Sequence, residues 1–480
     1  MPLELQSCAF DPADPRAALA TLPASPAVFA LHGADAHAEP YIGRTPNLRA
    51  RLERLLQPSP QHPRRLQLAG LVRTIQWQLT GSAFESLLAQ FMLLEQRFGP
   101  KALERMHLGH PAFVRFLGNN PYPRVTVTYH PSLREADWSY GPFPSRAAAE
   151  RYSEEVLKLF LLRRCTFDLN PDPTYPGCVY SEMKMCLAPC FKGCTDERYA
   201  AESAAVASFL ASRGESQLVP LSAQRDQASA DLAFESAAAL HAQVQRVESV
   251  RALAAELVRP LSHLRAVILQ ASANPGEVAV FLFENGRLRG PAAFSTQGMR
   301  IQNEQSGSSS LFAQPLALEP IPEEQGTGTR DQRSENQNSE NRHQGPEVRR
   351  NDSSEAPNAT GALKGTGALK GTGFSPYVIA SEQSGALAPE KSPAPPRLNR
   401  TLLESRLETA LAELSAMSSP PTPAIRQGHL ALLKRWYYRP EAKRTGEIFF
   451  PDAVNLWPIR SILRGISRVA AKSLSHAASD

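Results

Sequence analysis

The sequence predicts a multidomain α+β protein. Short apolar strands alternate with amphipathic helices before residue 100, a helical hairpin lies at 222–258, and a β-hairpin follows at 264–294. A length of 480 residues suits two to four domains at about 150 residues each. The apolar share of 42% allows buried cores, which excludes a wholly disordered or collagen-like chain. No apolar run is long enough for a membrane span, and the first residues lack a signal-peptide core, so we expect a cytoplasmic protein without a membrane partner.

Residues 24–105 predict a small α/β domain. The apolar segments 27–31 and 41–43 are typical of strands. Leucines at i, i+4, i+7 and i+8 then predict an amphipathic helix, and a second apolar series predicts another helix that begins near Phe84. Residues 106–215 form a cysteine-rich domain in this prediction, and 216–260 form a helical hairpin.

The composition changes after the β-hairpin, which we place in residues 261–299. From Gln325 to Gly373 there is no aromatic residue, and the hexapeptide Gly-Ala-Leu-Lys-Gly-Thr occurs twice in tandem. Such a segment cannot bury enough apolar surface to offset its ordering entropy. We therefore expect a disordered linker over 300–397 and a helical, basic and aromatic segment over 398–480.

An arginine-rich face follows the second predicted strand. Residues 44–73 contain seven arginines and a single acid, Glu53. Guanidinium groups bind phosphates bidentately, so this face predicts a phosphodiester partner, with DNA-binding candidates at Arg49, Arg54, Arg64 and Arg65. Hydrolysis of a phosphodiester needs a base and a positive charge at the phosphate, for which Tyr41 and Arg51 are the candidates. The alternative is a solvated basic helix beside an ordinary strand.

These residues resemble a GIY-YIG nuclease domain of the kind found in UvrC, a bacterial excinuclease subunit. Ala27-Val28-Phe29 and Tyr41-Ile42-Gly43 stand where that family has its two motifs. The resemblance implies that Tyr41 is the general base and that Arg44 and Arg51 contact phosphate. It also implies a divalent metal, Mg²⁺ or Mn²⁺, bound by a glutamate of a following helix.

The match departs from the family pattern most consequentially at two positions. Gln90 stands where the resemblance places the metal-binding glutamate, and Phe29 stands where a tyrosine is usual. A neutral amide holds Mg²⁺ more weakly than a carboxylate. Glu85 and Glu95 are each five residues from Gln90, which is roughly 140° away around a helix, so we expect neither to substitute. The resulting hypothesis is an impaired or altered nuclease.

The cysteines predict a metal site. Five of the six lie within residues 165–194, and in a cytoplasmic chain such clustering indicates metal ligands rather than disulfides. Spacing alone leaves Zn²⁺ and an iron–sulfur cluster open. The surrounding segments, 138–145 and 185–190, closely resemble UvrC. That resemblance implies a 4Fe–4S cluster, with Zn²⁺ as the alternative, and leaves Cys194 as an extra thiol; the implied ligands are Cys165, Cys178, Cys186 and Cys190.

The helical hairpin resembles the UVR motif through Leu232, Phe234 and Glu235. In that family the motif pairs with a similar hairpin of UvrB, so the resemblance implies a UvrB-like partner through residues 222–258. A hairpin this small cannot bury its own apolar face, which also indicates an interaction module. The alternative is a helix pair packed into the core of flanking domains.

Residues 425–444 combine six basic side chains with Trp436, Tyr437 and Tyr438. Basic and aromatic side chains together suit single-strand binding, whereas an amphipathic helix with these rings in a small core is the alternative. UvrC would continue into an RNase H-like domain and helix-hairpin-helix motifs. Neither is recognisable after residue 295, so the chain resembles a shortened UvrC, closer to its homologue Cho.

Three functions remain open from the sequence. The first is a nucleotide-excision-repair protein that incises DNA at most once. The second is a DNA-binding scaffold that has lost cleavage, which Gln90 and Phe29 favour. The third, a zinc-binding interaction protein unrelated to DNA, requires the nuclease match to be accidental.

Overall fold

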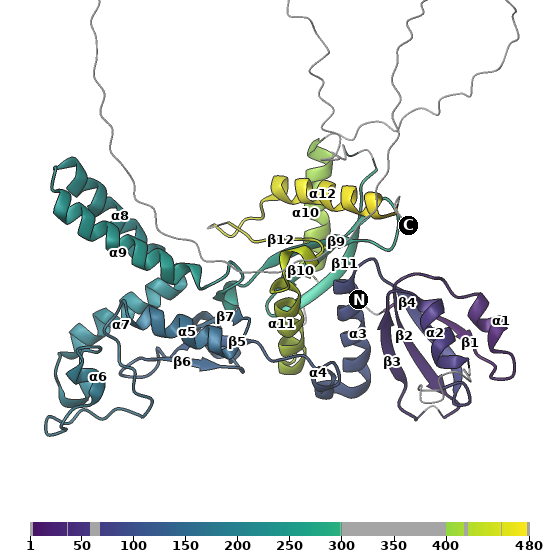
Figure 1. The fold of residues 1–480 in the computed structure, drawn as a ribbon, viewed down its shortest axis with the longest axis horizontal. Coiled ribbons are helices and arrows are strands. Elements are labelled where there is room, and N and C mark those ends of the chain that lie inside the picture. Colours follow the sequence, from purple (N-terminus) through teal and green to yellow (C-terminus); the bar gives the residue numbers. More distant parts are fainter. Residues whose placement is uncertain are drawn as a thin grey trace, which may run out of the picture. The chain divides into compact units, whose positions relative to one another are not determined.

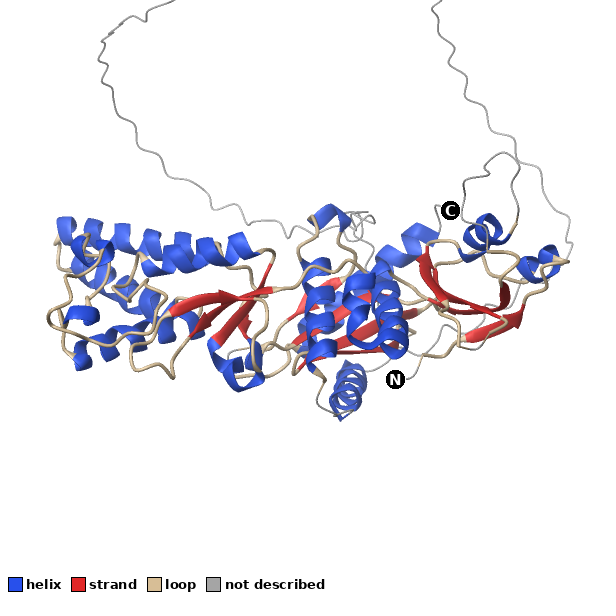
Figure 2. Cartoon of the chain, turned by 90° about the horizontal axis from the view of Figure 1, so that it is seen from below, coloured by secondary structure: helices blue, strands red, loops and turns tan. Residues whose placement is uncertain are grey.

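The computed structural model describes residues 3–35, 37–57, 68–297, 299, 400–416, 421–452 and 454–477. The described part is a mixture of helices and antiparallel sheets, which confirms the predicted combination of α and β structure (Figures 1 and 2). The predicted linker over 300–397 lies outside it. No helix among the described residues is long and apolar enough to cross a membrane.

The first sheet is enclosed by helices on both faces. Phe29 and Leu31 of its central strand share a core with the leucines of α2, whereas Val28 packs against Ala89 and Leu93 of α3. This alternation follows from the two-residue period of a strand. The sheet order is β1-β4-β2-β3, so β3 is an edge. The elements are β1 (Gln6–Ala9), α1 (Pro15–Ala20), β2 (Ala27–Gly33), β3 (Tyr41–Thr45), α2 (Leu48–Leu56), β4 (Val72–Leu79), α3 (Ala83–Phe98) and α4 (Ala102–Arg105).

Polar side chains fix where the two long helices of this domain begin. The Asn47 side chain accepts a hydrogen bond from the backbone N–H of Ala50 at 2.9 Å and caps α2. The Ser82 hydroxyl accepts from the N–H of Glu85 at 3.1 Å and caps α3. Each cap satisfies a helix N–H that has no partner within the helix. The caps thereby set the helix starts that place Arg51 and Gln90.

The second sheet belongs to the cysteine-rich region. Its order is β6-β5-β7-β8, and its core includes side chains of α5, α7 and α9. None of the residues of α8 is buried, so the α8–α9 hairpin packs mainly through α9. The elements are β5 (Ala112–Phe116), β6 (Val125–Thr128), β7 (Ser139–Phe143), α5 (Arg146–Leu157), α6 (Val179–Glu182), α7 (Asp196–Ala211), α8 (Glu215–Ala230), α9 (Phe234–Ala252) and β8 (Arg259–Pro260).

The third sheet joins two segments that the sequence places in separate parts, 261–299 and 398–480. Its order is β11-β10-β9-β12, and Ile448 of β12 lies opposite Ile268 of β9. Helices α10 and α12 cover one face, and α11 packs into the core on the other. The elements are β9 (Ala266–Ala271), β10 (Glu277–Glu284), β11 (Arg287–Ser295), α10 (Arg400–Ala416), α11 (Pro423–Tyr437), β12 (Glu447–Phe449) and α12 (Ile459–Ala477).

Helix α3 packs against both the first and the third sheet. Its Phe84 ring meets Phe281 of β10 at 5.2 Å and Trp436 of α11 at 5.3 Å between ring centroids. A side chain at Gly428 of α11 would overlap the ring of Phe91, so only glycine permits this close approach of α11 to α3. One helix therefore connects the arginine-bearing domain to the C-terminal segment.

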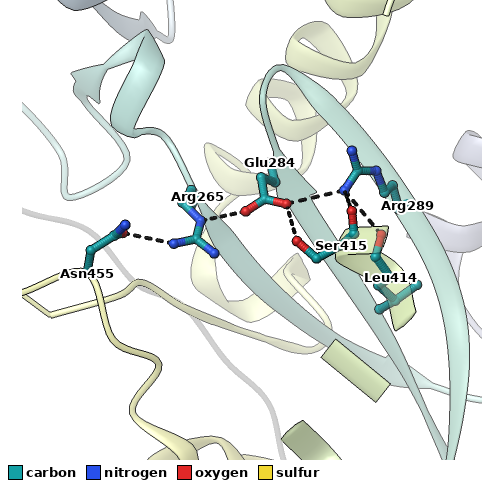
Figure 3. A network of polar contacts seen from close by, with 6 residues as sticks. All are labelled: Arg265, Glu284, Arg289, Leu414, Ser415 and Asn455. Carbon is teal, nitrogen blue, oxygen red and sulfur yellow. Dashed lines mark hydrogen bonds and ion pairs between the residues drawn. The ribbon is translucent and has the colours of Figure 1, made fainter. Parts of the chain in front are cut away.

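A buried polar network holds the third sheet to the end of α10 (Figure 3). The Glu284 carboxylate accepts from Arg289 at 3.2 Å and from the Ser415 hydroxyl at 2.6 Å, and it pairs with Arg265 at 2.8 Å. The same Arg289 nitrogen donates to the Leu414 carbonyl at 3.1 Å. Two guanidinium groups around one carboxylate satisfy a buried charge that would otherwise be costly.

Candidate functional site

Tyr41 and Arg51 meet at the edge of the first sheet. Tyr41 is the first residue of the edge strand β3, and Arg51 lies in the first turns of α2. The Arg51 Nη2 atom donates to the Tyr41 phenol oxygen at 3.3 Å. Both side chains are half-buried, so this pair of candidate base and candidate phosphate contact keeps access to solvent.

Phe29 occupies the core directly behind this pair. It is fully buried, it pairs with Gly43 across β2 and β3, and its ring centroid lies 6.1 Å from that of Tyr41. A Cβ atom at Gly43 would lie 2.8 Å from the Phe29 ring, so only glycine leaves room for this ring against β3. The Phe29 ring thus has a packing role.

Arg44 lies on the other face of β3, towards α3. Alternation along the strand puts Arg44 on the side of Ile42, which packs against α3. The pKa of Arg44 is lowered by burial of its guanidinium, and then by the positive charges of Arg435 and Arg439 in the C-terminal segment. The sequence indicates these two arginines only as part of the basic and aromatic segment 425–444, and not as neighbours of Arg44.

Gln90 is a half-buried residue of α3 and follows Ala89, which packs against Val28 of β2. Glu85 points elsewhere: its carboxylate accepts from the Gly81 N–H at 2.8 Å and burial raises its pKa. It lines a cavity of about 340 Å³, whereas Glu95 lines another of about 360 Å³ beside Arg287. That neither glutamate replaces a metal-binding carboxylate at Gln90 stays a prediction.

The donor set around Gln90 fits a divalent metal poorly. A glutamine supplies a neutral amide oxygen, and Mg²⁺ strongly prefers carboxylates. Among the described residues, no group of three or more histidine, cysteine, aspartate or glutamate side chains is arranged to hold a metal ion.

The predicted DNA-binding arginines differ in their surroundings. The Arg49 Nε atom donates to the Leu22 carbonyl at 2.7 Å, so this side chain also holds α2 to the segment after α1. The exposed Arg54 donates from Nε to the Ala50 carbonyl of its own helix at 3.0 Å. Arg64 and Arg65 lie outside the described residues.

The cysteine loop places its thiols within electrostatic reach of one another. Burial raises the pKa of the Cys186 thiol, a hydrogen bond from the Ala188 N–H opposes this, and Cys178, Cys190 and Cys165 raise it further. The loop is wound tightly, because Ala188 adopts a left-handed backbone with φ of 56°. The chemistry of this loop suits a thiolate-bound metal, because it combines four nearby thiols with backbone N–H groups directed at sulfur. The described thiols are not arranged in coordination geometry.

Helices α8 and α9 run side by side as a hairpin (Figure 1), and two large apolar side chains near its bend are exposed. Leu232 is 71% exposed and Phe234 is 66% exposed. At the other end of α9, Val244, Val247 and Val250 are buried. The base of the hairpin is therefore part of a core, and its tip is free to contact another molecule.

The aromatic residues of 425–444 are packing residues. Trp436 is 1% exposed, and its Nε1 atom donates to the Thr445 carbonyl at 3.0 Å. The Tyr438 hydroxyl donates to the Pro142 carbonyl at 3.0 Å. The core alternative for this helix is thus confirmed for its aromatic rings, and stacking on bases by Trp436 is excluded by its burial.

Comparison with known proteins places part of this chain beside UvrC. Residues 114–209 match the family model of the UvrC/Cho excinuclease middle domain. The chain is 32% identical to UvrABC system protein C of Alcanivorax borkumensis over 213 residues, which are 44% of this chain and 34% of that protein. It is 28% identical to the protein of the same name from Pseudomonas protegens over 308 residues, 63% of this chain and 49% of that protein. No solved structure matches.

The matched regions thus span about a third to a half of the curated relatives. The family match covers the whole cysteine loop.

Proposed function

We propose that this UvrC-like chain is a nucleotide-excision-repair protein that binds DNA and incises it on one side, at the edge of its first sheet. The hydrogen bond between Arg51 and Tyr41 is the observation that carries the proposal. It joins a candidate base to a permanent positive charge at a solvent-accessible edge. The names of the matched relatives, UvrABC system protein C, support the assignment to excision repair.

The residues present suggest how each would act on a phosphodiester. Arg51 orients the Tyr41 phenol oxygen and offers further N–H donors to the phosphate, whose negative charge grows during hydrolysis. In its ionised form Tyr41 would take the proton of the attacking water, and a proton from solvent would go to the oxygen that leaves phosphorus. Because Gln90 offers no carboxylate, we assign no step to a bound metal and expect slow incision.

The second candidate function is a DNA-binding scaffold without cleavage. The observations in its favour are the neutral Gln90 and the engagement of Glu85 with its own helix start. Incision and scaffolding share the DNA partner and differ only in turnover.

A nicking assay on damaged duplex DNA tests the proposal. Loss of the phenol in Tyr41→Phe is expected to lower nicking at least about a hundredfold and to leave DNA affinity within about twofold, because the ring remains in place. Tyr175→Phe removes an exposed hydroxyl of the cysteine loop and is the matched control. Equal nicking by wild type and Tyr41→Phe contradicts the role of Tyr41. DNA binding with no nicking by wild type selects the scaffold.

We further propose that Cys165, Cys178, Cys186 and Cys190 hold a 4Fe–4S cluster, with Zn²⁺ as the alternative metal. The family match over this loop and the mutual influence of the four thiols support the proposal. Cys190→Ser is expected to lose bound iron and sulfide after anaerobic purification, whereas Cys194→Ser retains them. Protein that contains zinc and no iron would reject the cluster. Loss of metal from Cys194→Ser would make that thiol a ligand.

The hairpin supports a partner proposal of its own. We assign residues 222–258 to the binding of a UvrB-like protein, because apolar side chains at the bend are exposed while the base is buried. Exposed apolar residues on a projecting helix pair are typical of a docking surface for another helical element.

A further inference from the structure

Arg435 and Arg439 lie at the C-terminal end of α11. Arg435 is an exposed residue of α11, and Arg439 follows four residues later, just past the helix end. Helix α11 packs on α3, and Ile42 of β3 contacts the core that α3 and α11 share. Arg44 lies two residues from Ile42 on the same face of β3, and the positive charges of Arg435 and Arg439 act on it and contribute to the lowering of its pKa.

Three other basic side chains of residues 425–444 have partners within the protein. Lys434 donates to the carbonyls of Gly109 and His110 at 3.0 and 3.2 Å. Arg426 is buried and donates to the Pro131 carbonyl at 3.2 Å, and the Arg444 guanidinium lies over the ring of Tyr437. These positive charges therefore stabilise the packing of α11.

Arg44, Arg435 and Arg439 differ from that group. Among the residues that the structure describes, no carboxylate forms an ion pair with any of the three. Three guanidinium groups in one place repel one another, and the repulsion is relieved by a ligand that carries several negative charges. Guanidinium groups suit phosphate because they donate two hydrogen bonds in a fixed geometry.

We propose that Arg44, Arg435 and Arg439 form a single phosphate-binding surface for the backbone of a DNA strand that passes the edge of β3. The inference rests on the proposed DNA-binding function and adds α11 to the surface that binds the strand. The contacts are to phosphate, so they position the DNA without reading its sequence. The segment after residue 399 thereby acquires a role in substrate binding.

Fluorescence anisotropy with a labelled damaged duplex, measured over a range of salt concentrations, tests this surface. The double variant Arg435→Glu/Arg439→Glu is expected to weaken binding at least about tenfold. The neutral Arg435→Gln/Arg439→Gln is expected to reduce the slope of log affinity against log salt by about two, one for each lost phosphate contact. Arg435→Lys/Arg439→Lys should retain most of that slope. A circular dichroism spectrum equal to that of wild type shows that each variant is folded.

Arg460 and Arg464 provide the matched control. They are exposed arginines at the same four-residue spacing on α12, which covers the opposite face of the third sheet. Arg460 also pairs with Glu404 of α10 at 3.6 Å, so the circular dichroism spectrum of this variant is compared with that of wild type as well. Arg460→Glu/Arg464→Glu changes the net charge equally and is expected to leave affinity within about threefold. If the control loses as much DNA affinity as the α11 variants, the proposed phosphate-binding surface is wrong. It is also wrong if the α11 variants bind DNA as tightly as wild type. Neither result contradicts the proposed DNA-binding function. Failure of wild type to bind DNA overturns the proposed function as well.

Discussion

Gln90→Glu is expected to raise metal-dependent nicking of damaged DNA by at least about tenfold over wild type. The substitution keeps the length and shape of the side chain and adds a negative charge to α3, whose Ala89 and Leu93 pack against Val28 of β2. Carboxylates bind Mg²⁺ far better than amides, and a tenfold gain corresponds to about 1.4 kcal/mol of additional transition-state stabilisation. Gln90 is half-buried, so the new charge retains contact with water.

A titration with Mg²⁺ and with Mn²⁺ measures this effect. Gln96→Glu adds the same charge at an exposed position of α3 and is expected to leave nicking unchanged. Tyr41→Phe in the Gln90→Glu background should remove the gained activity, because the gain depends on the same base. A folded Gln90→Glu protein without any gain would show that this position does not hold the metal.

Phe234→Asp is expected to weaken binding of a UvrB-like partner at least about thirtyfold. The ring is 66% exposed at the bend of the hairpin, and exposed aromatic anchors commonly contribute about 2 kcal/mol or more to an interface. Aspartate removes the apolar surface and places a charge where the partner would exclude water. The hairpin should keep its fold, because the buried contacts of α9 are made by Val244, Val247 and Val250.

Calorimetric titration with a UvrB-like protein gives the affinity directly. Val219→Asp is the control, because Val219 is 64% exposed in the same hairpin but lies near the start of α8. It is expected to bind the partner as wild type does. Unchanged affinity of Phe234→Asp would remove the bend from the interface, and absence of binding by wild type would exclude this partner for the hairpin.

Local signals predicted much of the first domain. The leucine stripe of 48–56 is the buried face of α2, and the segments at 27–31 and 41–43 lie within β2 and β3. The third sheet was not predicted as a unit. Strand β12 has three residues, and it pairs with β9 across more than a hundred intervening positions. Such pairing depends on tertiary contacts, which periodicity along the chain cannot show.

The candidate site, too, was predictable from local sequence patterns but not where it depends on tertiary contacts. A glycine-containing edge strand followed by an arginine-bearing helix indicated Tyr41 and Arg51, which the structure joins by a hydrogen bond. The neighbours of Arg44 could not be inferred, because Arg435 and Arg439 approach it only through the shared packing of α3. The basic composition of their segment was visible, but Trp436 is buried in the core rather than available to a ligand.

The division of the third sheet between two distant segments has a consequence for synthesis on the ribosome. Helix α3 is complete long before α11 and β12, which share its core, have been translated. Roughly 150 residues separate β11 from β12, so at about 5–20 residues per second the interval is on the order of ten seconds. During that time Phe84 and Phe91 lack the α11 half of their core. A nascent chain that pauses between residues 300 and 399 is therefore a good substrate for a chaperone that recognises exposed aromatic side chains.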